Sequence, residues 1–312
     1  MQLKASAPGS LMILGEYAVL HGHPALVAAI NQSITVTLTP RNDEHIEIHS
    51  DLHGVYSTSL SSLIIEKPFH FVLTAIKFYR SQLKFGFNLK IESQFTDQMG
   101  LGSSAAVTVA TLAAIATWLN IKMTPIRLLR DGRQVVREAQ DGLGSGADVA
   151  ASVYGGLVHY QAQPLFAESF PQLYPLTTWY SGFKTKTIDA IARVNQHFSS
   201  RVSLYRSIIQ SIGECAKQGV QYAQEGEWAK LGEVMTIQQG MMASLGVSMP
   251  RLNEMVDALH ALPSILGAKI SGAGLGDCVI GLGENNNLVF KQDGVKSLPL
   301  AMTRTGVTCE KI

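Results

Sequence analysis

The sequence predicts an α+β fold in which strands dominate the first third of the chain and helices dominate the second half. Apolar and polar residues alternate at 34–39, 46–48 and 85–91, which indicates strands with one buried face in an antiparallel sheet. An Ala- and Leu-rich run at 104–119 indicates a buried helix. Strands and helices do not alternate as regular strand–helix–strand units, so a doubly wound parallel sheet is disfavoured.

The later elements follow in chain order. A helix is expected over 124–140, because Pro125 suits the first turn of a helix. Residues 156–162 indicate another strand. The rest of the chain predicts helices over 187–245 (interrupted near Gly226) and 250–261, and short strands around Lys269, Val279 and Leu288.

A domain boundary is expected near residue 170. The stretch 163–175 is irregular and contains three prolines, Pro164, Pro171 and Pro175. We therefore divide the chain into domains 1–170 and 171–312. The length of 312 residues suits either one large domain or two of ordinary size.

Composition excludes several classes of protein. Lys and Arg total 25 against 24 for Asp and Glu, which disfavours a partner such as nucleic acid. Charged residues make up 16% and hydrophobic residues 46%, so the chain fills a core and is not a disordered protein. The three cysteines are far apart and form no CxxC pair, which disfavours a disulfide framework or a zinc site.

The same features predict a cytoplasmic protein that does not enter a membrane. The N-terminus reaches Pro8 without an apolar signal core, and the cysteine usage fits a reducing compartment. The uncharged run 98–120 opens with glycines and serines. About 15 residues then remain for a helix, fewer than the roughly 20 that a membrane span needs.

The glycine-rich segment 100–106 (GLGSSAA) gives the strongest local signal, because it lies between an expected strand and an expected helix. Glycines let the backbone approach a ligand closely, and a helix N-terminus offers free N–H groups that suit phosphate oxygens. The two serine hydroxyls add donors or a ligand for Mg²⁺. The alternative is an ordinary capped helix after a tight turn. No Gly-Lys-Ser/Thr follows, so this is not a Walker loop.

Two further glycine-rich segments carry candidate site residues. In 142–148 (GLGSGAD), Asp148 could orient a hydroxyl and accept its proton, or it could instead cap a helix. The segment 271–278 (SGAGLGDC) lies between two expected strands, so its alternative is a tight hairpin. His21 and His23 invite interpretation as metal ligands, but two histidines without further ligands favour a structural or surface role.

Taken together, three segments resemble the GHMP small-molecule kinases, the family of galactokinase, homoserine kinase, mevalonate kinase and phosphomevalonate kinase. They occur in the family's order, and the resemblance covers nearly the whole chain. They are Ala7-Pro8-Gly9 with 15–22 (GEYAVLHG), 100–106 and 271–278. The resemblance implies a two-domain fold with a ribosomal protein S5 domain 2-like N-terminal domain and a ferredoxin-like C-terminal domain.

Within the family, the run 15–29 is most similar to the mevalonate kinases, whereas Gly276-Asp277-Cys278 and 144–151 look more like phosphomevalonate kinases. The resemblance therefore implies ATP- and Mg²⁺-dependent phosphorylation of the primary hydroxyl of mevalonate, with phosphomevalonate as the alternative acceptor. It also implies a small-molecule substrate, and it leaves a homodimer open.

The resemblance assigns roles position by position. Asp148 matches the catalytic base, and Ser104 and Glu138 match the ligands of Mg²⁺. The residues matched to the ATP phosphates are Gly100, Leu101, Gly102, Ser103, Ser104 and Ala105. Those matched to the acceptor substrate are Glu16, Tyr17, Thr187, Gly272 and Ala273.

One departure from the family concerns Ser10, where these kinases usually have a lysine beside the catalytic aspartate. Such a lysine could lower the pKa of the aspartate or polarise the acceptor hydroxyl. Another cation could replace it, with Lys184 as the catalytic candidate and Lys186 as the alternative. Otherwise the aspartate suffices alone, or the chain is a weak or non-catalytic metabolite-binding relative.

Overall fold

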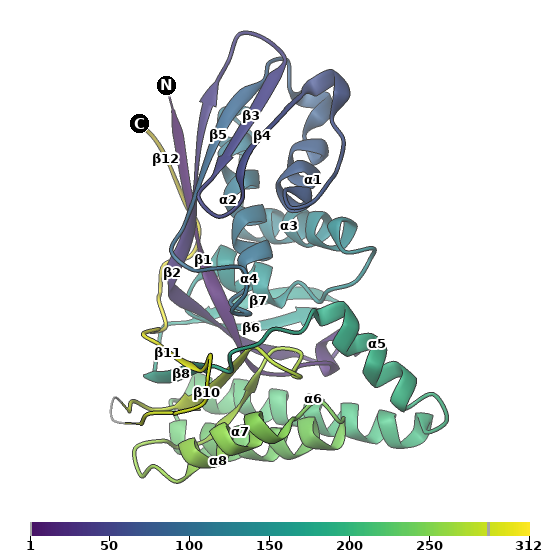
Figure 1. The fold of residues 1–312 in the computed structure, drawn as a ribbon, viewed down its shortest axis with the longest axis vertical. Coiled ribbons are helices and arrows are strands. Elements are labelled where there is room, and N and C mark those ends of the chain that lie inside the picture. Colours follow the sequence, from purple (N-terminus) through teal and green to yellow (C-terminus); the bar gives the residue numbers. More distant parts are fainter. Residues whose placement is uncertain (1, 286–287) are drawn as a thin grey trace.

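In the computed structural model, which describes residues 2–285 and 288–312, the N-terminal half of the chain is built on an eight-stranded sheet (Figure 1). Its strands are β1 (Leu3–Leu14), β2 (Ala25–Pro40), β3 (His45–Ser50), β4 (Gly54–Ser59), β5 (Phe87–Ser93), β6 (Leu157–Ala162), β7 (Leu165–Phe170) and β12 (Thr308–Lys311). They pair in the order β12-β1-β2-β5-β3-β4, and β6 and β7 extend from β2. The expected antiparallel sheet is present, although β3 and β5 pair in parallel.

Strand β1 is almost wholly buried, and it carries the first of the three segments described above. The register of its pairing with β2 shifts between Pro8 and Ser10. Such a bulge bends a strand and re-aims its side chains. A Cβ added at Gly9 would lie 2.7 Å from the carbonyl oxygen of Leu101, so glycine lets β1 pass close under the segment 100–106.

Four helices pack with this sheet: α1 (His70–Phe78), α2 (Ser103–Trp118), α3 (Pro125–Ala139) and α4 (Ala147–Tyr154). Helix α2 contacts β1 and β2 and is apolar on nearly all sides, as expected for a helix buried between a sheet and other helices. Figure 1 shows α1, α2 and α3 on one face of the sheet. Short 3-10 helices occur at η1 (Ala18–His21), η2 (Leu60–Ser62) and η3 (Arg80–Gln82).

The C-terminal half combines a four-stranded sheet with four helices. The strands pair in the order β11-β8-β10-β9, and the helices α6, α7 and α8 gather at the end of the molecule opposite the chain termini (Figure 1). The strands are β8 (Leu176–Tyr180), β9 (Ala268–Ser271), β10 (Cys278–Leu282) and β11 (Lys296–Leu298); the helices are α5 (Thr187–His197), α6 (Val202–Glu225), α7 (Trp228–Ser244) and α8 (Pro250–His260).

The α+β class expected from the sequence is confirmed, but one expected strand is wrong. Leu288 lies outside regular structure, and the strand near it is β11, which begins at Lys296. The division at residue 170 stays a prediction; the structure adds that β12 returns to pair with β1. Within residues 2–285 and 288–312, no helix combines the length and apolarity that crossing a membrane requires.

Candidate active site

The segment 100–106 forms the turn that leads into α2. Gly100 and Gly102 both have φ 69°, a left-handed conformation that favours glycine, and α2 begins at Ser103. The carbonyl of Leu101 accepts a hydrogen bond of 3.0 Å from the amide of Ser10. The first N–H groups of a helix have no partners within the helix, so this turn presents donors and a partial positive charge to an anion.

Asp148 lies next to this turn through Ser10. The Ser10 hydroxyl donates a hydrogen bond of 2.7 Å to Oδ1 of Asp148, and a Cβ added at Gly102 would lie only 2.1 Å from the same hydroxyl oxygen. Ser10 thus occupies the space between the glycine turn and the carboxylate. Asp148 is the second residue of α4, after the cap residue Gly146, so its alternative interpretation as the helix cap is wrong.

The environment of Asp148 favours a carboxyl group that readily holds a proton. Its side chain is only partly exposed, and burial raises its pKa above the ordinary value. The negative charge of Glu16 raises the pKa further, whereas the hydrogen bond from Ser10 lowers it. A base that accepts a proton from a hydroxyl works best when its pKa is nearer to the working pH than that of a free carboxyl group.

A buried ion pair ties the first segment to the third. Glu16 (3% exposed) pairs through Oε1 with the ammonium of Lys269 (0% exposed) on β9, and its Oε2 accepts a hydrogen bond of 2.5 Å from Gln238 on α7. The amide of Gly272 also donates to Oε1, at 3.3 Å. Burial lowers the pKa of Lys269, and the charge of Glu16 opposes that shift. Both oxygens of Glu16 therefore have partners in the protein.

The third segment forms the connection between β9 and β10, which pair antiparallel as the hairpin interpretation requires. The hydroxyl of Tyr17 donates a hydrogen bond of 2.6 Å to the carbonyl of Ala273. Gly272 has φ 88°, and a Cβ added there would meet no atom within 4 Å, so this glycine faces open space. Tyr17, Gly272 and Ala273, all predicted to contact substrate, are thus brought together.

Asp277 lies at the other end of the same connection and contacts the glycine turn at 100–102. A Cβ added at Gly100 would lie 2.7 Å from both Cβ and Cγ of Asp277. Burial raises the pKa of Asp277 to about 7, and Lys184 lowers it. The turn therefore has a carboxylate at each end, Asp277 at Gly100 and Asp148, through Ser10, at Gly102.

Three predicted site residues have no described contact with Asp148 or Ser10. The ammonium of Lys184 donates to the backbone carbonyl of Asp97, and no described contact joins it to Asp148. Glu138 is exposed at the end of α3 and forms an ion pair of 2.8 Å with Lys77 of α1. Thr187 is the exposed first residue of α5. Asp148 has the Ser10 hydroxyl as a hydrogen-bond partner, and what replaces the family lysine stays open.

The oxygen atoms at the turn fit Mg²⁺, a cation that proteins hold with one or two carboxylates while substrate phosphates and water supply its other ligands. The hydroxyls of Ser103 and Ser104 begin α2, and the carboxylates of Asp148 and Asp277 flank the turn. Oδ1 of Asp277 is buried without a hydrogen-bond partner. Among residues 2–285 and 288–312, no group of three or more His, Cys, Asp or Glu side chains is arranged to hold a metal ion, so phosphates would have to complete the coordination.

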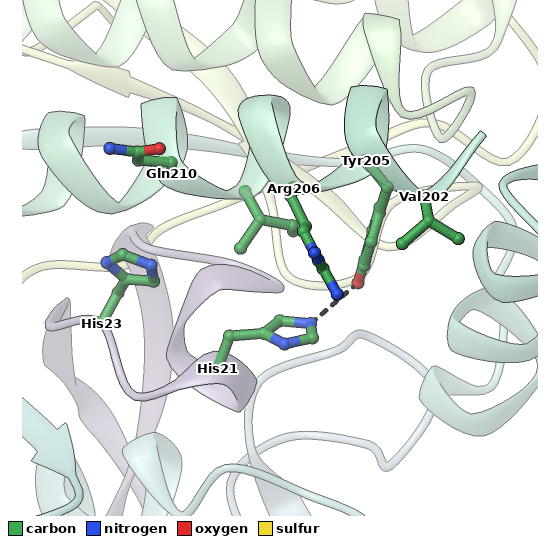
Figure 2. A pocket seen from close by; sticks show the side chains of 7 residues that line it. His21, His23, Val202, Tyr205, Arg206 and Gln210 are labelled. Carbon is green, nitrogen blue, oxygen red and sulfur yellow. Dashed lines mark hydrogen bonds between the residues drawn. The ribbon is translucent and has the colours of Figure 1, made fainter.

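A cleft of about 540 Å³ opens beside the segment 15–22, between η1 and α6 (Figure 2). His21 shares a hydrogen bond of 2.9 Å with the hydroxyl of Tyr205, and Arg206 points from α6 toward the same place. His23 lines the cleft too, and burial together with the charge of His23 lowers the pKa of His21. Arg206 is therefore the side chain that brings a permanent positive charge to this cleft.

Lys269, Gln238 and the position of Asp277 were missed by the sequence analysis. A signal existed for Lys269, because a lysine in a short apolar strand next to a glycine turn requires a buried counter-charge. Gln238 offered no signal, since the sequence does not distinguish it from Gln239, the other glutamine on α7. In the sequence, Asp277 was considered only because Gly276-Asp277-Cys278 looks more like the phosphomevalonate kinases. Its place between a glycine-rich turn and a buried strand also suggested a carboxylate held in one position.

Comparison with known proteins gives consistent matches. Residues 70–156 match the family described as GHMP kinases N terminal domain, and residues 220–291 match that described as GHMP kinases C terminal. The "Mevalonate kinase" of Thermococcus sibiricus is 28% identical, covering 100% of this chain and 99% of that protein.

Two solved structures are similar in fold. A Lin0012 protein from Listeria innocua has a TM-score of 0.87 with 23% identity and covers 100% of both chains. The Streptococcus pneumoniae phosphomevalonate kinase, in complex with phosphomevalonate and AMPPNP, has a TM-score of 0.76 with 21% identity. That match covers 91% of this chain and 92% of the other.

Proposed function

Since this chain belongs to the GHMP kinase family and is an ATP-dependent small-molecule kinase, we propose that it transfers the terminal phosphoryl group of ATP to the primary hydroxyl of mevalonate. The observation that carries this proposal is the contact of Asp148 with the glycine turn through Ser10. It puts a candidate base beside a candidate phosphate site. The relatives called mevalonate kinase support the choice of acceptor.

In this proposal the backbone amides at Gly100–Ala105 bind the ATP phosphates, and Asp148 accepts the proton of the acceptor hydroxyl. Phosphoryl transfer depends mainly on positioning and on the charge around the phosphates, so one oriented base suffices. Ser10 holds Oδ1 of Asp148 in place. Mg²⁺, when bound, neutralises phosphate charge, and the Ser104 hydroxyl is proposed as one of its ligands; Glu138 would have to leave Lys77 to join it.

The acceptor is proposed to lie against the connection between β9 and β10. Tyr17, Gly272 and Ala273 form one surface there, and Glu16 acts through its hydrogen bond with the Gly272 amide rather than by touching substrate. Lys184 comes from the segment before α5, and Thr187 is the first residue of α5; both are exposed. Lys184 is proposed to act on the phosphate side, because its charge lowers the pKa of Asp277.

Phosphomevalonate is the second candidate acceptor, and the cleft that contains Arg206 favours it. An acceptor that carries a phosphate needs more positive charge around it than mevalonate does. Arg206 on α6 supplies such a charge on the side of the cleft across from η1. The homodimer and the cytoplasmic location stay predictions.

The test is ADP release with ATP and Mg²⁺, measured in parallel with mevalonate and phosphomevalonate. We expect turnover with mevalonate, a large loss of it in Asp148→Asn, and nearly unchanged ATP affinity in that variant. Asp257→Asn, an exposed aspartate on α8, is the matched control and should keep wild-type rates. Turnover with phosphomevalonate alone would transfer the proposal to that acceptor, and turnover with neither would refute both.

A further inference from the structure

Asp277 is held by the backbone in a conformation that is unusual for a residue with a side chain. Its φ is 63°, in the left-handed region. Its amide donates a hydrogen bond of 2.9 Å to the carbonyl of Phe183, and its carbonyl accepts one of 2.9 Å from the amide of Ser181. Strain of this kind persists where the surrounding structure fixes it, and it is frequent at ligand sites. The direction of the Asp277 side chain is therefore set by its backbone.

That direction leads to the first glycine of the phosphate-binding turn. A Cβ added at Gly100 would lie 2.7 Å from Cβ and Cγ of Asp277 and 3.0 Å from its Oδ1. Only glycine fits at this position, because any side chain would collide with the carboxylate. The next residue strengthens the contact, since the thiol of Cys278 donates to the carbonyl of Met99 at 3.1 Å.

The carboxylate has no partner that explains its burial. Asp277 is 7% exposed, and its Oδ1 finds no donor in the described part of the chain. A buried polar atom without a partner costs about 1–3 kcal/mol, and more when it is charged. Lys184 is the cation close enough to lower the pKa of Asp277, but its ammonium donates to the carbonyl of Asp97 instead.

A bound nucleotide would raise the cost of keeping the Asp277 carboxylate charged and buried, because its phosphates would bring further negative charge to the turn that Asp277 touches. A divalent cation between the phosphates and the carboxylate would remove the repulsion, and carboxylate oxygen is a preferred ligand of Mg²⁺. Glu138, the carboxylate expected in that role, pairs with Lys77 on the exposed side of α3.

We propose that Asp277 is a ligand of the divalent cation that accompanies the nucleotide, at the end of the phosphate-binding turn opposite Asp148. This proposal depends on the proposed function in one respect: it assumes that the ligand at the turn is a nucleotide with its divalent cation. It adds a metal-binding role for the connection between β9 and β10, in a residue that the sequence did not suggest as a metal ligand.

The test measures binding of Mn²⁺ as the probe by electron paramagnetic resonance, with ADP at saturating concentration and no acceptor. Asp277→Asn should weaken the Mn²⁺ affinity at least tenfold, since losses of this order follow even from removing groups that only support metal ligands. Affinity for ADP without metal should stay equal or rise. Asparagine tolerates a positive φ as aspartate does, so the backbone is preserved.

Asp97→Asn is the matched control. Asp97 lies three residues before Gly100, and its carboxylate has other neighbours, Gln98 at 3.0 Å and His53 at 3.8 Å. The control should change Mn²⁺ affinity less than twofold. If thermal denaturation shows that Asp277→Asn is destabilised, Asp277→Gly repeats the test, because glycine suits the left-handed conformation.

Mn²⁺ affinity within twofold of the wild type in a folded Asp277 variant would overturn the proposal. So would an equal loss in Asp97→Asn, which would indicate a general effect of charge. The two proposals fail separately. If the enzyme turns over mevalonate but Mn²⁺ binding does not depend on Asp277, only the metal-binding role is refuted. If Mn²⁺ binding with ADP depends on Asp277 but neither acceptor is turned over, only the kinase assignment is refuted.

Discussion

Replacing Lys269 by methionine tests the buried ion pair that joins β9 to the segment after β1. Lys269→Met keeps an unbranched side chain of similar volume and removes the ammonium. Glu16 then keeps its hydrogen bonds from Gln238 and Gly272 but loses its counter-charge. Because Lys269 is 0% and Glu16 3% exposed, water cannot replace the lost partner.

Removing one partner of a buried ion pair costs about 3–5 kcal/mol, whereas replacing both partners by well-packed neutral groups is often neutral. The same reasoning applies here, since neither group reaches solvent. We therefore expect Lys269→Met to lower the free energy of unfolding by about 3–5 kcal/mol. The double variant Glu16→Gln/Lys269→Met should recover most of that loss, because the glutamine amide replaces the buried charge.

The assay is urea denaturation followed by tryptophan fluorescence for the wild type, both single variants and the double variant. A double-variant cycle isolates the interaction between the two side chains when the slope of the transition does not change. A loss below about 1 kcal/mol in Lys269→Met would show that the charge is compensated elsewhere. A double variant no more stable than Lys269→Met would refute the ion pair as the source of the loss.

Two further substitutions test the contact between the turn and the base. Ser10→Ala removes the hydrogen bond that lowers the pKa of Asp148, so that pKa should rise and the acid limb of the kcat/KM profile should move to higher pH; an unchanged profile would contradict the role of Ser10. Gly102→Ala places a Cβ 2.1 Å from the Ser10 hydroxyl and should weaken ATP binding at least about tenfold by calorimetry, from distortion costing roughly 1.4 kcal/mol or more. Gly226→Ala has the same left-handed backbone, φ 75°, but no atom within 4 Å, so it controls for backbone strain alone; equal losses of ATP affinity in both would count against the steric reasoning.

Local patterns were enough to predict the helix at the glycine turn and four strands of the first sheet, β2, β3, β5 and β6. The expected helix 104–119 is α2, Ser103–Trp118, because a turn of glycines and serines marks its start unambiguously. Strand β1 was not predicted, since Pro8 and Gly9 interrupt the alternation that identifies a strand. A bulge accommodates both residues, and a bulge depends on the partner strand rather than on the local sequence.

The candidate site, too, could be predicted only where the local sequence carries the signal. Asp148 was proposed from a glycine-rich segment, and the resemblance to the GHMP kinases added Tyr17 and Ala273 as candidates; all three lie in or beside segments that are visible in the sequence. Partners that come from distant segments were not accessible in that way. Lys269 meets Glu16 across 253 positions of the chain, and the role expected of Lys184 presumed a contact that only the folded chain could reveal.

The connection between β9 and β10 restricts how the two halves of the molecule move relative to each other. Together with the two strands that it joins, it holds the N-terminal half at several separate points: Lys269 at Glu16, Ala273 at Tyr17, Asp277 at Gly100 and Cys278 at Met99. A hinge opening between the halves would break these contacts together and expose a buried charge. Access for an acceptor would therefore depend on local motion of the exposed residues 184–189, which precede and begin α5.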